Sequence, residues 1–254
     1  MRTAALGLLV VGAALVVAAV PRGLAAWEAR GAGPVVHALG RGQSPDDASL
    51  AAGIEALQRA ADFPGSPASI HGDLALLLLE SARRGASDPE RALAEVGAAV
   101  EAQRRGLALS PADGSGWARL VYAHDLGESL AQARAIWALD PDDPGPAPPM
   151  TQAEALEALE MAFLTRDLSF SLVRFRLQAA GERWASLPPW LRTAARKEVL
   201  ELTRYGVRGA DALVDLYLAR PDGPLAPIIE EELQSDPKQQ TLFERRLARR
   251  PGRG

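Results

Sequence analysis

The residues best suited to metal binding or acid–base catalysis in this chain are its three histidines, His37, His71 and His124. None of them stands in an H-x-x-x-H or H-E-x-x-H arrangement, the spacings that place two imidazoles on one helix face. His71 has Asp73 and Glu80 nearby in the sequence, which suggests a metal or acid–base cluster. On a helix, however, Asp73 and Glu80 share one face and His71 falls on another. We therefore predict no histidine-based site.

Other catalytic signatures are missing from the sequence. It has no cysteine, no glycine-rich phosphate loop and no G-x-S-x-G motif. His124 follows Trp117 and Leu120 on one helical stripe, which indicates a packed imidazole and not a ligand. Three serines stand at the entries of expected helices and are typical of helix caps; these are Ser44, Ser110 and Ser169. We expect no catalytic residue, no metal and no cofactor, and an all-helical enzyme is the least favoured interpretation.

Composition predicts an all-α protein. Ala, Leu, Arg and Glu dominate the 254 residues, and aromatic residues make up only 5% of them. The formal net charge of −4 gives no electrostatic reason to expect nucleic acid as the main partner. Without cysteine the chain forms no disulfide, so it suits a reducing or an oxidising compartment equally.

The N-terminus is directed to a membrane. Residues 3–20 are uncharged and apolar, follow a basic start, and are about long enough to span a bilayer. One interpretation is a cleaved signal peptide, with small residues at Val17 and Ala19, or at Gly23 and Ala25, near the cleavage site. The other is a retained anchor, which we favour because the apolar run exceeds the roughly 7–15 residues of a signal core.

Membrane orientation is poorly determined by the sequence. Arg2 on one side of the apolar run is balanced by Arg22 and Arg30 on the other. The very short tail before the run favours an N-terminus inside, which would put the soluble part in the periplasm as a single-pass protein of the inner membrane. Trp27 fits either the membrane interface or an ordinary surface position.

Turn signals divide the rest of the chain. We expect the anchor or uncleaved signal at 1–26, a Gly- and Pro-rich linker at 27–45, helical hairpins at 46–145 and a C-terminal helical region at 146–250. Capping signals begin helices at Asp46, at Ser87-Asp88-Pro89-Glu90 and at Asp236-Pro237. The run DPDDPGPAPP that starts at Asp140 forbids a helix and separates the two halves.

One stretch carries a partial repeat pattern. Its aromatic, small and proline positions are spaced as in a helix–turn–helix repeat, and they are Pro111, Trp117, Leu120, Ala133 and Trp137. The region from about Glu90 to Pro144 therefore resembles the tetratricopeptide (TPR) family. The resemblance implies stacked antiparallel helical hairpins, a TPR-like α-solenoid after the N-terminal transmembrane helix. It also implies a turn between a helix at Trp117 and a second helix at residues 130–139.

A second resemblance covers residues 151–250. It is to the C-terminal part of small membrane-anchored TPR-like proteins that accompany bacterial exopolysaccharide or O-antigen assembly. The residues that carry it are the runs FSLVRFRLQAAGERWASL and LPPWLRTAARKEVLELTRYG. This resemblance brings no catalytic residues with it.

The remaining candidate site is a concave helical surface that would bind a peptide or a partner helix. Basic and aromatic residues gather near its expected centre, and they are Arg104, Arg105, Trp117, Arg119 and Tyr122. These observations suggest a membrane-anchored, periplasm-facing scaffold that binds protein partners in the membrane or periplasm. A structural subunit, whose transmembrane helix packs among partner helices through Ala13-Ala14 and Ala18-Ala19, is the alternative.

Overall fold

The computed structural model describes residues 17, 19–137, 147–165 and 169–250, and every regular element in these ranges is helical. This confirms the all-α class. Contacts divide the chain into unit 1, Met1–Gln152, and unit 2, Ala153–Gly254. The sequence predicts the division between residues 145 and 146, a few residues earlier, within the proline-rich run. Each unit is described separately below.

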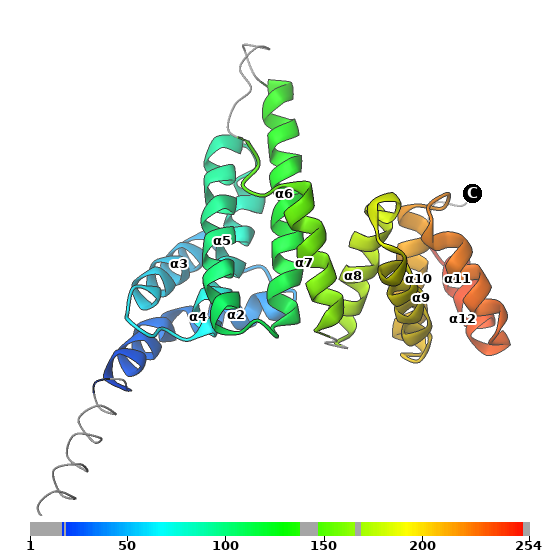
Figure 1. Cartoon of the computed structure of the whole chain (residues 1–254), viewed down its shortest axis with the longest axis horizontal. Coiled ribbons are helices and arrows are strands. Elements are labelled where there is room, and N and C mark those ends of the chain that lie inside the picture. Colours follow the sequence, from blue (N-terminus) through cyan, green and yellow to red (C-terminus); the bar gives the residue numbers. More distant parts are fainter. Residues whose placement is uncertain (1–16, 18, 138–146, 166–168, 251–254) are drawn as a thin grey trace, which may run out of the picture. The chain divides into compact units, whose positions relative to one another are not determined.

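The segment expected to be a linker is largely helical. Residues 19–28 form a helix, the 3-10 helix η1 (Ala29–Ala32) follows, and α2 covers Gly33–Gly40 (Figure 1). Pro34 is tolerated because it lies in the first turn of α2, where no intrahelical donor is lost. Ala32 and Val35 are buried, and η1 packs against α3, the helix over Asp47–Ala61. The segment is therefore part of the folded body of unit 1 and does not act as a loose tether.

The expected membrane span, residues 3–20, lies outside the described residues except for positions 17, 19 and 20. In the described part of the chain, no helix has both the length and the apolar character needed to cross a bilayer.

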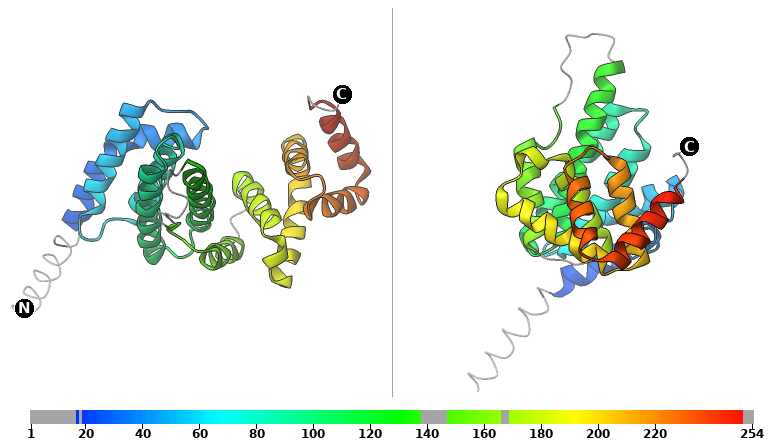
Figure 2. Two further views of the ribbon diagram at one scale, coloured as in Figure 1. Left: turned by 90° about the horizontal axis from the view of Figure 1, so that it is seen from above. Right: turned by 90° about the vertical axis from the view of Figure 1, so that its right-hand side faces the viewer.

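Four longer helices complete the regular structure of unit 1: α3 (Asp47–Ala61), α4 (Ala68–Arg84), α5 (Pro89–Leu109) and α6 (Gly114–Trp137). Consecutive helices pack against each other, and the short turns after α4 and α5 make α4, α5 and α6 alternate in direction, while α3 crosses them obliquely (Figures 1 and 2).

Local capping explains where these helices begin. The Asp46 carboxylate accepts the backbone N–H of Ser49 at 2.8 Å and starts α3. Asp88, the residue before Pro89, accepts the backbone N–H of Arg91 at 3.3 Å and starts α5.

Helix α6 contradicts the hairpin implied by the TPR resemblance. It runs without interruption over the stretch where a turn was expected, so Trp117 and Ala133 lie on the same helix. Gly127 is buried in the middle of it, and a methyl group built there would lie 3.2 Å from Pro149 Cδ. The glycine therefore serves the close approach of residue 149, and nothing in the sequence around it breaks the helix. A regular solenoid remains a prediction.

Unit 2 consists of shorter helices. They are α7 (Gln152–Leu164), α8 (Phe170–Glu182), η2 (Trp184–Ser186), α9 (Pro189–Thr203), α10 (Val207–Ala219), α11 (Leu225–Gln234) and α12 (Pro237–Ala248). Helix α8 ends at Glu182, and the 3-10 turn η2 follows it almost directly. Helix α8 packs on α9, and α10 packs on α9, α11 and α12.

A buried ion pair ties three helices of unit 2 together. Arg176 of α8 is fully buried, and its Nε donates to Glu198 Oε2 of α9 at 3.1 Å. A second contact joins Arg176 Nη2 to the other Glu198 oxygen. Arg176 Nη1 donates to the carbonyl of Ala162 in α7 at 3.1 Å, and the guanidinium lies 5.4 Å from the Phe163 ring. Because water cannot reach the Glu198 carboxylate, the buried guanidinium of Arg176 compensates its negative charge.

Candidate functional site: a groove between α3 and α5

Unit 1 has a groove of about 650 Å³ that is lined by α3, the C-terminal half of α4 and α5. Its floor contains the buried side chains of Leu50 and Leu78. Its walls carry three exposed alanines, Ala51 of α3 with Ala94 and Ala98 of α5. Because alanine side chains are short, another helix can approach these walls closely. The groove therefore offers an apolar seat with small residues on both sides.

Charged side chains border this seat, and most of them are paired. Arg91 and Glu95 of α5 form an i,i+4 ion pair at 3.1 Å. Glu55 of α3 pairs with Arg59 at 3.0 Å. Since Arg91, Glu55 and Arg59 each expose more than half of their side chain to water, these pairs contribute little to stability but keep the rim polar. An apolar centre inside a polar rim is the usual composition of a protein-binding surface.

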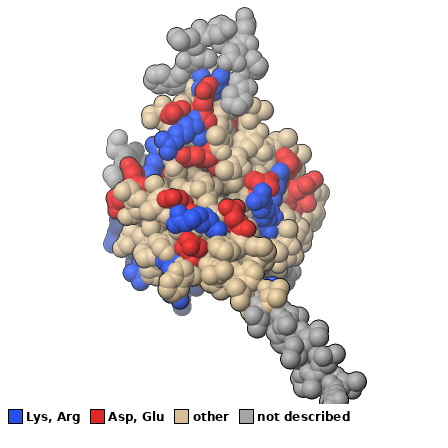
Figure 3. All heavy atoms as spheres, turned by 90° about the vertical axis from the view of Figure 1, so that its left-hand side faces the viewer, with Lys and Arg blue, Asp and Glu red and all other residues tan. Residues whose placement is uncertain are grey.

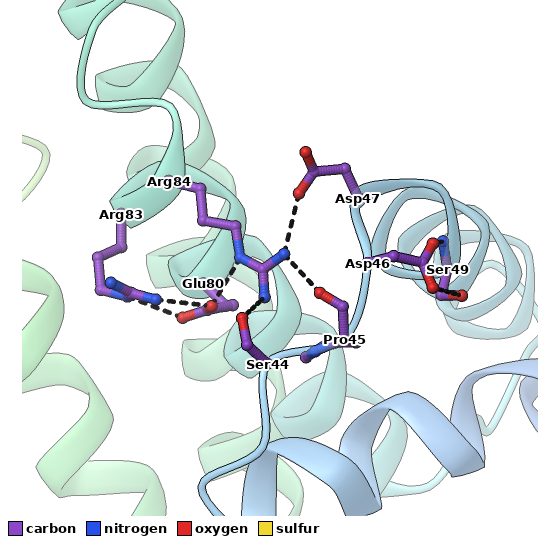
Figure 4. Close-up of polar contacts among 8 residues, drawn as sticks. All are labelled: Ser44, Pro45, Asp46, Asp47, Ser49, Glu80, Arg83 and Arg84. Atoms are coloured by element: carbon purple, nitrogen blue, oxygen red, sulfur yellow. Dashed lines mark hydrogen bonds and ion pairs between the residues drawn. The ribbon is translucent and has the colours of Figure 1, made fainter.

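Arg84, at the last position of α4, lines the groove, and its polar contacts are drawn in Figure 4. Its Nε donates to Glu80 at 2.8 Å, and its Nη2 donates to the Ser44 hydroxyl at 2.9 Å. Its Nη1 donates to the Pro45 carbonyl at 2.7 Å and to Asp47 at 2.9 Å. A single side chain thus joins the end of α4 to the segment that enters α3.

Glu80 holds this arginine in place. Its carboxylate accepts from Arg83 at 2.8 and 2.9 Å as well as from Arg84 (Figure 4). The hydrogen bond from Arg83, followed by that from Arg84, keeps the pKa of Glu80 below its ordinary value although burial acts in the opposite direction. The carboxylate therefore stays ionised at neutral pH, and the spacing between α3 and α4 is fixed beside Arg84.

Charge is mixed on the molecular face drawn in Figure 3, where basic and acidic side chains alternate in small clusters. Such a surface does not steer a partner of one charge over a long distance. Recognition in the groove therefore depends on the apolar seat more than on net charge.

None of the five residues chosen from the sequence lines the groove. Trp117 is half-buried, and its indole Nε1 donates to the carbonyl of Pro111 at 2.8 Å, which fastens the start of α6 to the turn before it. Arg104 and Arg105 are exposed on α5, and Arg105 pairs with Glu101 at 3.2 Å.

The other two candidates, Arg119 and Tyr122, lie about one helical turn apart on α6. Arg119 donates to Gln103 Oε1 at 3.4 Å, and Tyr122 is half-buried beside Glu80 and Arg83. Burial raises the pKa of the Tyr122 hydroxyl. The structure therefore groups Arg119 with Tyr122, and it separates both from the groove.

The histidines form no site in the described residues, where no group of three His, Asp or Glu side chains could hold a metal ion. His71 and His124 are buried and His37 is exposed. Burial, assisted by the nearby Arg105, lowers the pKa of His71. The imidazole Nδ1 of His124 lies 3.2 Å from Asp125 Oδ1.

Ser44, expected to be a helix cap, instead accepts the hydrogen bond from Arg84, and Asp46 caps α3. No sequence motif singles out Arg84 as a residue of the groove. Its i,i+4 spacing from Glu80 is visible in the sequence and predicts that one contact. The contacts with Ser44, Pro45 and Asp47 cross about forty residues and have no sequence signal.

Comparisons with known proteins give no assignment. No protein-family model matches the chain, and no curated protein and no solved structure matches it.

Proposed function

We propose that this protein is a membrane-tethered helical adaptor that holds an amphipathic helix of a protein partner in the groove between α3 and α5. The observation that carries the proposal is the groove itself, with buried leucines on its floor and exposed alanines on both walls. Amphipathic helices bind such grooves by laying their apolar face on the floor.

The membrane tether is supported by the apolar run at residues 3–20. A tether restricts the groove to the neighbourhood of the bilayer, where the local concentration of a membrane-bound partner is high. At this local concentration, even a modest affinity of the groove for the partner helix would keep the groove occupied. We place the adaptor in a bacterial envelope complex, with unit 2 available for further protein contacts.

Site-specific photocrosslinking tests the groove directly. The photoreactive residue p-benzoylphenylalanine replaces Ala94, which is exposed on the groove wall, in the full-length chain in its native membrane. As a matched control it replaces Ala108, which is exposed on the same helix and does not line the groove. We expect a discrete protein adduct from position 94 and none from position 108.

A second substitution shows whether the adduct depends on the groove. Ala98→Trp fills the seat on the same wall, so it should abolish the adduct from position 94. Equal adducts from positions 94 and 108, or an adduct that survives Ala98→Trp, would exclude the groove as the binding site. Replacing residues 3–16 by an unrelated membrane segment should leave the adduct intact. Its loss would instead favour a subunit whose membrane segment packs against partner helices.

A further inference from the structure

The helix over residues 19–28 has an uncovered apolar stripe. Val17, Val20, Leu24 and Trp27 follow one another at i, i+3, i+7 and i+10, which places them on one side of a helix. Their exposed fractions run from 48% for Leu24 to 73% for Val17. Water-exposed apolar side chains in such a continuous row mark a surface that another apolar phase covers.

The neighbouring side of the same helix is fixed to unit 1. Ala25 is fully buried, and Arg22 Nε donates to the carbonyl of Gly65 at 3.4 Å. Glu28 accepts from Arg59 Nε of α3 at 3.1 Å. Arg22, Ala25 and Glu28 all lie within this helix, so its stripe holds a set orientation relative to α3.

Two features of the stripe point to lipid as the apolar phase. It continues a stretch of sequence, residues 3–16, that contains no charged residue. Its last member is Trp27, and the guanidinium of Arg30 lies 4.3 Å from the centre of that indole ring. Tryptophan prefers the boundary between headgroups and acyl chains, and a basic side chain beside it meets anionic lipid.

We propose that the helix over residues 19–28 lies along the lipid–water boundary, with Val17, Val20, Leu24 and Trp27 against the acyl chains. This deepens the proposed tether and rests on it: the chain docks unit 1 on the bilayer surface in one orientation. Because Arg59 follows the groove residue Gln58 in α3, that end of the groove lies beside the membrane-facing helix. The partner helix is therefore held close to the bilayer.

The test uses the natural lack of cysteine in the chain. Full-length Leu24→Cys and Ala26→Cys variants are each labelled with a polarity-sensitive fluorophore. Both positions are exposed, and Ala26 points about 160° away from Leu24 around the helix. The purified proteins are added to vesicles of phosphatidylcholine and phosphatidylglycerol in equal parts, with or without a doxyl quencher high on the acyl chain. Flotation measures how much protein is bound.

We expect the label at position 24 to shift to the blue and to lose most of its fluorescence to the doxyl lipid, while the label at position 26 stays in water. A protein that floats with both labels in water, or with both quenched alike, overturns the docking and leaves the tether in place. A blue shift at position 24 without doxyl quenching means that a second copy covers the stripe, which also overturns it. If the protein does not float with the vesicles, both the tether and the docking are refuted. The groove proposal is tested separately, by the photocrosslink from position 94.

Discussion

Replacing Arg176 with methionine removes the cation from the buried pair of unit 2 and leaves the Glu198 carboxylate without it. The Arg176 side chain is 0% exposed and that of Glu198 only 10%, so water cannot take over the lost contacts. Removing one partner of a buried pair typically costs about 3–5 kcal/mol. The Ala162 carbonyl keeps one donor, because the Thr165 hydroxyl also bonds to it at 3.0 Å. The penalty therefore comes mainly from the isolated carboxylate.

Hydrogen exchange followed by mass spectrometry measures this penalty within unit 2. A loss of about 3 kcal/mol corresponds to exchange faster by roughly 10²-fold in α8 and α9 when exchange follows the opening equilibrium. Arg174→Met is the matched control, since Arg174 lies on the same helix with 47% of its side chain exposed and pairs with Asp215 at 3.3 Å. A surface pair contributes at most about 1 kcal/mol, so exchange should rise by no more than roughly fivefold.

The double variant Arg176→Met, Glu198→Met separates pairing from burial. Two apolar side chains of similar length need no charge compensation, so exchange should return close to that of the unchanged protein. If Arg176→Met behaves like Arg174→Met, the pair does not hold α8 to α9 and the reasoning is wrong. If the double variant exchanges as fast as the single one, the lost contacts are packing contacts and not the isolated charge.

Two further predictions concern unit 1. Arg84→Met should lower the unfolding free energy of unit 1 by about 2 kcal/mol in urea denaturation, because a part-buried, charge-assisted network is lost; Arg83→Met, at a neighbouring and more exposed side chain, should cost clearly less. Glu128→Pro should lower the unfolding free energy of unit 1 by about 3 kcal/mol or more, since position 128 lies inside continuous helix α6. If the protein tolerates this proline without loss of stability, α6 is interrupted there by the turn that the TPR resemblance implies.

The sequence by itself determined the all-α class and where several helices begin. Caps act within one turn of the chain, so Asp46 before α3 and Asp236 before α12 could be recognised from local residues alone. The apolar stripes were equally local, and buried positions such as Leu50 and Leu57 lie where the helical period predicts.

Only the tertiary structure decided which polar residues matter and what each glycine is for. Arg84 and Arg176 are indistinguishable in sequence from the exposed arginines, because their partners come from distant segments that meet only after the helices pack. Gly127 could mark a turn or a close contact, and the proximity of Pro149 selects the second. The groove is likewise invisible in any single helix, since it exists only where α3 and α5 stand on either side of α4. Local propensity therefore set the helices, and long-range packing set the site.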